Sequence, residues 1–227
     1  MTNETPNETP NETPKAPNER LKSPRLRLFV ALDLPEGFLD RLVDWQQQAF
    51  GERRDLRLLD RYSLHVTLAF LGYQAERDVE RIRELAFSEP GGPFQLRAID
   101  LAEVPPRRPR LYALDLEDEG GKLGQWQAGL SERLQGGGFY EPEKRQFWTH
   151  LTVARFKQTE RHRTSGGARG SRGGGKGPAS RPEPLPELPE DLLAPFEASR
   201  LTLYRSTLRP QGAVYEPLAR TEPRAVE

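Results

Sequence analysis

Apolar and polar residues alternate in several short runs along the chain, which is the pattern of half-buried β-strands. Residues 26–34 (LRLFVALDL) and 110–116 (RLYALDL) form two of these runs, and the first ends at Pro35. Two further runs begin directly after a proline and read FQLRAIDL from position 94 and FEASRLTL from position 196. The pattern predicts four strands, each with one face available for burial.

Apolar residues with helical spacing lie between these strands. Phe38, Leu42 and Trp45 fall at i, i+4 and i+7, which predicts an amphipathic helix. A second segment, around Trp126, has less regular spacing, and residues 75–87 (AERDVERIRELAF) predict a third helix. We therefore expect helices that pack their apolar faces on the sheets.

Three short peptides occur twice and in the same order, which indicates an internal duplication. They are ALDL at 31–34 and 113–116, Trp-Gln at 45–46 and 126–127, and HVTLAF at 65–70, which matches HLTVAR at 150–155. The repeated unit is strand, helix, strand and strand. It predicts an α+β fold of two lobes related by a pseudo-twofold axis, each an antiparallel sheet with helices on the outside and a cleft between them.

Two polar segments lie outside this pattern and set the domain boundaries. Residues 1–23 contain three copies of NETP and are too polar to repay the entropy of ordering, so we expect a disordered tail. Residues 159–190 are rich in Gly, Pro and Arg and predict a low-complexity insertion. This insertion is either a surface loop or a cationic arm that contacts phosphates. The remainder of 24–227 is expected to be one bilobal domain.

Composition narrows the chemistry. The 227 residues include no cysteine, which excludes disulfides, thiolate metal sites and thiol nucleophiles. Lys plus Arg and Asp plus Glu both number 34, so any site for a polyanion must be built locally. The N-terminal residues lack the apolar core of a signal peptide, and no apolar run is long enough to span a bilayer. We expect a cytoplasmic protein, monomeric and without membrane contact.

The duplicated hexapeptides carry the candidate chemistry. Residues i and i+2 of a strand point to the same face, so His65 and Thr67 project together, and so do His150 and Thr152. If the lobes are related by a twofold axis, the two faces meet across the cleft. A single histidine in an apolar strand is more often a structural residue, but the pairing of both with threonine favours a functional site. The third histidine, His162, lies in the insertion and is expected to be exposed.

Other sites for histidine chemistry fit the sequence less well. A zinc site needs three or four ligands, and neither motif has a neighbouring Asp, Glu or Cys on its strand face. No GxSxG sequence supports a serine triad. Two facing imidazoles can serve as acid and base near neutral pH, and the hydroxyls can donate to the oxygens of a phosphate. The set suits metal-free transfer at a phosphodiester, which also needs a cation.

Arg155 is one candidate for that cation. It stands five residues after His150, where the first copy has Phe70. An odd offset places Arg155 on the opposite strand face unless the strand bends there. A surface arginine at a strand end is an equally good interpretation.

Other candidate substrate contacts are two arginines and two aromatic residues. Arg107 and Arg110, in the sequence VPPRRPRLY, either position an RNA backbone or are simply solvated. Phe29 and Tyr62 could stack on a base. For Phe29, packing in the core is the competing interpretation.

With both HxT units in place, the sequence resembles the 2H phosphoesterase superfamily, and more closely the bacterial and archaeal RNA 2′,3′-cyclic phosphodiesterases, originally named 2′-5′ RNA ligases. The resemblance covers about residues 25–158 and 194–219. The matching stretches are RLFVALDLP, LHVTLAFLG, RPRLYAL, FWTHLTVARFK and LTLYRSTL.

The resemblance implies His65 as proton donor, His150 as proton acceptor, and Thr67, Thr152 and Arg155 as phosphate-binding residues. It implies hydrolysis of RNA 2′,3′-cyclic phosphate ends to 2′-phosphates without cofactor or metal, and a related reversible 2′-5′ ligation. Two alternatives remain open on sequence grounds: a noncatalytic module that binds RNA ends, and a phosphodiesterase for small cyclic nucleotides.

Overall fold

A computed structural model describes residues 23–157 and 184–221. The predicted disordered tail, apart from its last residue, lies outside the described residues. So do residues 159–183 of the predicted insertion, including His162. The fold below refers to the two described ranges.

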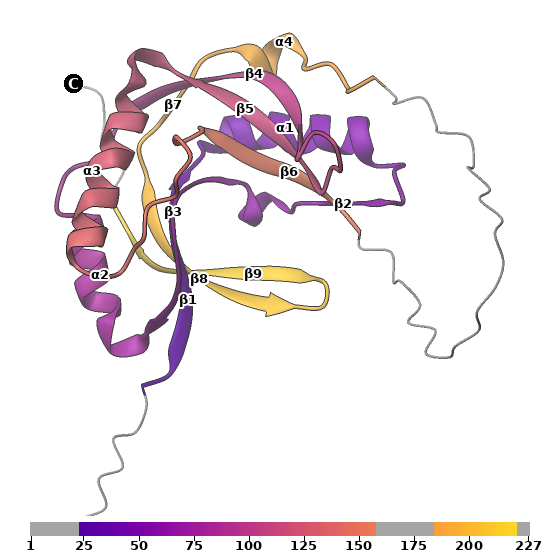
Figure 1. Cartoon of the computed structure of the whole chain (residues 1–227). Helices are drawn as coiled ribbons and strands as arrows, with labels where there is room; N and C mark the ends of the chain where they lie inside the picture. The colour runs from indigo at the N-terminus through magenta and orange to yellow at the C-terminus, as the bar shows by residue number, and fades with distance from the viewer. Residues whose placement is uncertain (1–22, 158–183, 222–227) are drawn as a thin grey trace, which may run out of the picture.

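Two antiparallel sheets form the framework of the molecule (Figure 1). Sheet A has the strand order β3-β1-β8-β9 and consists of β1 (Arg25–Asp33), β3 (His65–Ala75), β8 (Leu201–Arg209) and β9 (Gly212–Arg220). Sheet B has the order β2-β6-β5-β4-β7 and consists of β2 (Leu56–Leu58), β4 (Phe94–Val104), β5 (Leu111–Asp118), β6 (His150–Phe156) and β7 (Phe196–Ala198). Every pair of neighbouring strands is antiparallel. The α+β class and the strands predicted at 26–34, 94–101 and 110–116 are confirmed. The run predicted as one strand from Phe196 is instead divided into β7 and the start of β8, which belong to different sheets.

Helices cover the outer faces of the sheets, as the repeated unit predicts. They are α1 (Glu36–Phe50), α2 (Val79–Ala86), α3 (Lys122–Gly136) and the short α4 (Glu190–Leu193). Phe38 of α1 stacks on Phe196 at 4.0 Å between ring centroids, and Phe50 stacks on Tyr112 at 5.0 Å, so α1 packs on sheet B. Helices α2 and α3 lie together beside sheet A (Figure 1). The helix predicted at 75–87 begins as the 3₁₀-helix η2 (Glu76–Asp78) and becomes α-helical at Val79.

The two lobes exchange strands. β4 follows β3 in the sequence but pairs with β5 in sheet B, and β8 pairs with β1 in sheet A. Each lobe therefore contains a strand from the other half of the sequence. This arrangement was not predicted, because periodicity identifies a strand and its buried face but not its partner. One continuous apolar core joins residues of both sheets and all four helices.

Candidate active site

The two HxT units project side chains to one face of each sheet, as alternation predicts. On β3 the side chains of His65 and Thr67 are partly exposed, whereas Val66 and Leu68 are buried in the core. On β6 the partly exposed residues are His150 and Thr152, and the buried ones are Leu151 and Val153. A strand paired with each motif strand, β1 for β3 and β5 for β6, contributes an aspartate, since Asp33 pairs with His65 and Asp115 pairs with His150.

Each motif strand contains a β-bulge, and the bulge in β6 determines on which face of the strand Arg155 lies. On β6 the register passes from Thr152 directly to Ala154, so that Val153 is the extra residue. Val153 and Ala154 are both buried, and Arg155 is turned back to the exposed face that carries Thr152. Because the bulge interrupts the alternation, Arg155 lies on the same strand face as His150 although it stands five residues after it.

The first motif has the same bulge at the same place. The register passes from Thr67 to Ala69, and the exposed residue that follows is Phe70. The guanidinium of Arg27 from β1 lies over the Phe70 ring, 4.3 Å from its centroid, and donates to Ser206 Oγ at 2.7 Å. Thus the first lobe also has a guanidinium next to Phe70, the residue that corresponds to Arg155, but this guanidinium belongs to Arg27 of the neighbouring strand β1.

Two buried glutamines bind the carbonyls of the bulged residues. Gln46 Nε2 on α1 donates to the carbonyl of Val153 and, at 3.0 Å, to that of Leu59. Gln127 Nε2 on α3 donates to the carbonyl of Leu68 at 3.0 Å. These are the glutamines of the two Trp-Gln pairs, so the helix of each half supports the motif strand of the other half. The repeat of Trp-Gln was visible in the sequence, but its function in the bulge was not.

His65 lies in an aromatic environment. Its ring stacks on Phe29 at 4.9 Å between centroids and meets the Tyr215 ring edge-on at 5.2 Å. The Nδ1 atom is buried and has no hydrogen-bond partner among the described residues. Burial lowers the pKa of the imidazole to about 4, and the positive charge of Arg155 contributes to the decrease. The arginine of the second motif thus acts on the histidine of the first, across the two sheets.

His150 has a polar partner instead. Its Nδ1 lies 2.8 Å from the carbonyl oxygen of Trp148, and the two rings are stacked at 4.1 Å with an interplanar angle of 11°. The indole Nε1 of Trp148 donates to Asp115 Oδ1 at 2.7 Å. Trp148 and Asp115 were not among the predicted site residues.

Asp33 occupies the corresponding position in the first lobe. Its carboxylate accepts hydrogen bonds from Thr202 Oγ1 at 2.8 Å and from the Tyr204 hydroxyl at 2.9 Å. Burial raises the pKa of Asp33, although the bonds from Thr202 and Tyr204 oppose the increase. The repeated ALDL peptides therefore place an aspartate beside each histidine, bonded to an aromatic side chain in both lobes.

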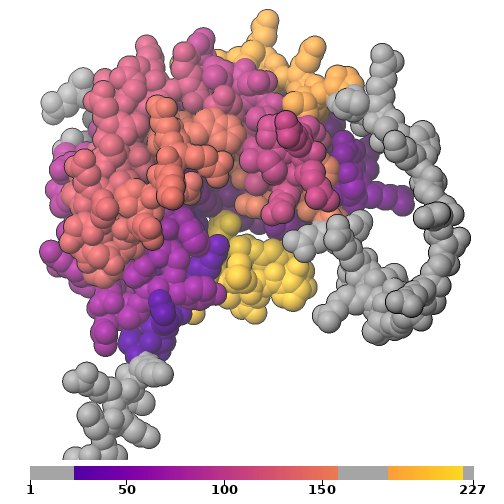
Figure 2. Space-filling view, viewed as in Figure 1, coloured from indigo at the N-terminus to yellow at the C-terminus, as the bar shows by residue number. Residues whose placement is uncertain are grey.

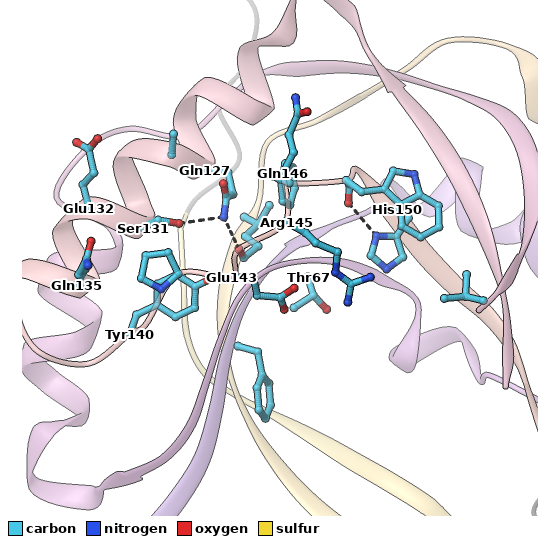
Figure 3. Close-up of a pocket in the computed structure, with 17 residues that line it drawn as sticks. Thr67, Gln127, Ser131, Glu132, Gln135, Tyr140, Glu143, Arg145, Gln146 and His150 are labelled. Carbon is cyan, nitrogen blue, oxygen red and sulfur yellow. Dashed lines mark hydrogen bonds between the residues drawn. The ribbon is translucent and has the colours of Figure 1, made fainter. Parts of the chain in front are cut away.

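A pocket of about 610 Å³ contains residues of both motifs. Thr67 and Phe70 from β3 and His150 from β6 line it, together with Gln127 and Ser131 of α3 and several residues between Tyr140 and Trp148. His65, Thr152 and Arg155 are not among the lining residues. In Figure 3, Thr67, Arg145 and His150 lie toward one end of the pocket, and Glu132 and Gln135 lie toward the other. Figure 2 shows the molecular surface hollowed between the β8–β9 hairpin and the segments of sheet B.

The residues predicted to contact substrate differ in their exposure and in their distance from the pocket lining. Phe29 is only 3% exposed and packs behind His65 with Tyr204, so its face is not open to a base; the competing core interpretation was the right one. Tyr62 is 85% exposed in the 3₁₀-helix η1 (Arg61–Ser63) and remains free to stack. Arg107 and Arg110 are exposed around the β4–β5 turn, outside the lining of the pocket.

The described residues also bear on metal binding and membrane contact. Within residues 23–157 and 184–221, no group of three or more His, Cys, Asp or Glu side chains is placed to hold a metal ion. No helix in these ranges is long and apolar enough to cross a bilayer. Independence from metal stays a prediction.

Comparison with known proteins connects this geometry to a family. The model of the family described as LigT like Phosphoesterase matches residues 32–111, which include α1, β3 with the first HxT motif, and β4. Over this range the chain is similar to the LigT-like phosphoesterases.

Curated relatives and solved structures extend the similarity of this LigT-like domain over most of the chain. A protein of Methanocaldococcus jannaschii named RNA 2′,3′-cyclic phosphodiesterase is 26% identical over 191 residues, which are 84% of this chain and 97% of the relative. A protein of the same name from Methanothermobacter thermautotrophicus is 27% identical over 197 residues, 84% of this chain and 95% of the relative. The crystal structure of E. coli LigT in apo form superposes with a TM-score of 0.66 at 23% identity and covers 88% of this chain and 98% of LigT. The last comparison establishes the fold.

Proposed function

We propose that this LigT-like protein hydrolyses RNA 2′,3′-cyclic phosphodiester ends to 2′-phosphates by acid–base catalysis with two histidines. The observation that supports the proposal most strongly is the effect of Arg155 on His65, because it means that the two motifs share one electrostatic environment. The names of the curated relatives support the reaction. The pocket that both motifs line supplies the space for substrate.

His150 is the proposed proton acceptor. The Trp148 carbonyl can only accept a hydrogen bond, so Nδ1 of neutral His150 carries the proton and Nε2 keeps its lone pair. In the proposed reaction, Nε2 takes a proton from a water molecule as the water oxygen attacks phosphorus. The bond between phosphorus and O3′ then breaks, which leaves a 2′-phosphate.

His65 is the proposed proton donor to the departing O3′. The low pKa of its imidazole, about 4, keeps it unprotonated at neutral pH before substrate binds. An anionic phosphodiester beside the ring favours imidazolium and offsets the charge of Arg155. We infer that His65 takes up its proton as the substrate binds and gives it to O3′. Exchange with solvent returns both histidines to their initial states.

Thr67, Thr152 and Arg155 are proposed to bind the nonbridging phosphate oxygens. The two hydroxyls donate hydrogen bonds, and the guanidinium offsets the charge that gathers on these oxygens in the transition state. None of the proposed steps requires a metal ion. With a 5′-hydroxyl of RNA in place of water, the same two proton transfers would form a 2′-5′ phosphodiester, and reversal would cleave it.

The pocket also bears on the choice of substrate. Its volume of about 610 Å³ extends from His150 along α3, well beyond a cyclic phosphate. We propose that nucleotides preceding the cyclic phosphate occupy it, which favours RNA ends over cyclic mononucleotides.

Turnover by the full chain in excess EDTA tests the proposal. We expect conversion of an oligonucleotide with a 2′,3′-cyclic phosphate end to the 2′-phosphate, at a higher kcat/KM than for a cyclic mononucleotide. The double variant His65→Ala/His150→Ala measures contaminating activity. Binding that weakens with salt but yields no product would replace the proposal with an RNA-end-binding module. Faster turnover of the mononucleotide would contradict the assignment of RNA as substrate.

A further inference from the structure

We propose that Trp148, anchored by Asp115, is the positioning residue that makes His150 the proton acceptor of the pair. The inference rests on the proposed function for its catalytic consequence. Among the described residues, Nδ1 of His150 contacts a carbonyl oxygen and Nδ1 of His65 has no hydrogen-bond partner, although the two histidines begin similar motifs.

Trp148 holds His150 through two different contacts. The backbone carbonyl oxygen is 2.8 Å from Nδ1, and the indole ring covers one face of the imidazole at 4.1 Å with the planes within 11° of parallel. The indole is itself fixed, because Nε1 donates to Asp115 Oδ1 at 2.7 Å. Asp115 pairs with His150 in the β5–β6 register. The sheet, the hydrogen bonds and the stacked rings therefore form one closed arrangement around the imidazole.

The arrangement determines which nitrogen can act as a base. A carbonyl oxygen selects the tautomer with hydrogen on Nδ1, and it orients the ring so that the Nε2 lone pair is presented to the reacting water. A rotated or mixed-tautomer ring would present an N–H instead, which cannot accept a proton. The indole of Trp148 is hydrogen-bonded to Asp115 and its carbonyl oxygen to His150, so the fixed side chain keeps the carbonyl in place.

The stacked indole also favours the product of proton transfer. His150 becomes an imidazolium when it takes the proton, and the face of an indole ring attracts a cation. The carboxylate at the indole N–H adds negative charge on the same side. Because this attraction is stronger after the proton has been taken up, it stabilises the transition state more than the ground state.

The first lobe has a related aromatic contact, since Tyr204, which donates to Asp33, stacks on His65 at 5.8 Å between ring centroids, but it lacks the carbonyl contact. The residue two positions before His65 is Ser63, in the 3₁₀-helix η1, and its hydroxyl donates to Asp60 Oδ2 at 3.1 Å. Among the described residues nothing bonds His65 Nδ1, and the ring stacks on Phe29 instead. The sequences SLH and WTH thus differ at the position that separates the proton donor from the acceptor.

Nitrogen-15 NMR of the histidine-labelled full chain at alkaline pH tests the proposal without substrate. The signals that are absent from the spectrum of His150→Gln are those of His150. We expect the Nδ1–H tautomer in the wild type, a loss of this preference in Trp148→Leu and Asp115→Ala, and retention in Asp115→Asn, whose amide oxygen still accepts from the indole. Trp148→Phe, which keeps an aromatic ring and conserves the fold, should be intermediate. The matched variant of the first lobe, Asp33→Asn, should leave the His150 signals unchanged.

Turnover gives the second readout. Trp148→Leu should lower kcat about 10- to 100-fold, with no further loss in a His150→Ala background. A wild-type His150 with hydrogen on Nε2, or an unchanged tautomer in both Trp148→Phe and Trp148→Leu, would overturn the proposal. An activity loss that persists in the His150→Ala background would overturn it as well. Absence of all turnover in the wild type contradicts the proposed function, whereas the tautomer result stands by itself.

Discussion

The imidazole of His65 lies against aromatic rings with a buried Nδ1, whereas that of His150 bonds a carbonyl oxygen. The same four-residue pattern therefore produces two imidazoles in different surroundings. For His65 the cost of burying charge is the larger cause of its low pKa, and Arg155 is the second. As the proposed proton donor, His65 must gain its proton against both effects, and a bound phosphate anion can offset them.

Removing the charge of Arg155 should raise the pKa of His65. In Arg155→Gln, the ligand-free protein should show a higher His65 pKa that still lies below the ordinary value, because only the smaller of the two causes is removed. Proton NMR titration of the imidazole Cε1–H signal measures it. Arg145→Gln is the matched control, since Arg145 lines the pocket but is not among the causes of the shift. Equal pKa values of His65 in Arg155→Gln and wild type would contradict the proposed electrostatic interaction between Arg155 and His65.

At the scale of elements, the bulges in β3 and β6 decide which side chains reach the site. Each bulge lets a threonine and a residue three positions later share a face, which regular alternation forbids. A bulge leaves backbone groups outside the regular ladder, and buried polar groups need partners. Gln46 and Gln127 provide them from helices of the opposite sequence half.

Loss of the Gln46 amide should disturb Arg155 more than the rest of the site. We expect Gln46→Leu to destabilise the fold by about 1–3 kcal/mol, because a carbonyl in the core loses a donor. We expect it also to lower kcat/KM, and this loss should largely disappear when measured in an Arg155→Gln background. Steady-state kinetics on a cyclic-phosphate oligonucleotide, with urea unfolding, measure both effects.

Gln127→Leu is the control for that experiment. It removes the equivalent bond in the first motif, where the bulge presents Phe70, so its kinetic loss should be the same with and without Arg155. If the Gln46→Leu loss is equally independent of Arg155, the bulge does not position the arginine.

At the scale of the whole molecule, one core supports two lobes that exchange strands and helices. β4 and β8 each pair in the sheet of the other half, and α1 and α3 each bond the opposite motif strand. The two histidines therefore depend on the same packing, and neither lobe completes its motif strand alone. This explains how two motifs that begin 85 residues apart in sequence, at 65 and 150, both contribute to the lining of one pocket, through Thr67 and His150.

The sequence predicted the parts of this arrangement that depend on local periodicity. Alternation was enough to assign His65 and Thr67 to one face, and duplication was enough to pair them with the second motif. The face of Arg155 could not be assigned, because a bulge interrupts alternation without a sequence signal. The exchange of β4 and β8 depends on tertiary pairing. Trp148 stands in FWTH beside the histidine, but only the structure shows that its carbonyl and its ring both contact the imidazole.

The central claim is that His65 and His150 act as one unit, and a double-mutant cycle of turnover tests it most directly. The full-length wild type, His65→Ala, His150→Ala and the double variant are compared for kcat on a cyclic-phosphate oligonucleotide in EDTA, with circular dichroism to verify folding. Groups that act together are strongly non-additive. We predict that each single substitution lowers kcat by about 10³-fold or more, and that the double variant is no slower than the slower single variant. Near-wild-type turnover in either single variant, or losses that multiply in the double variant, would contradict the account.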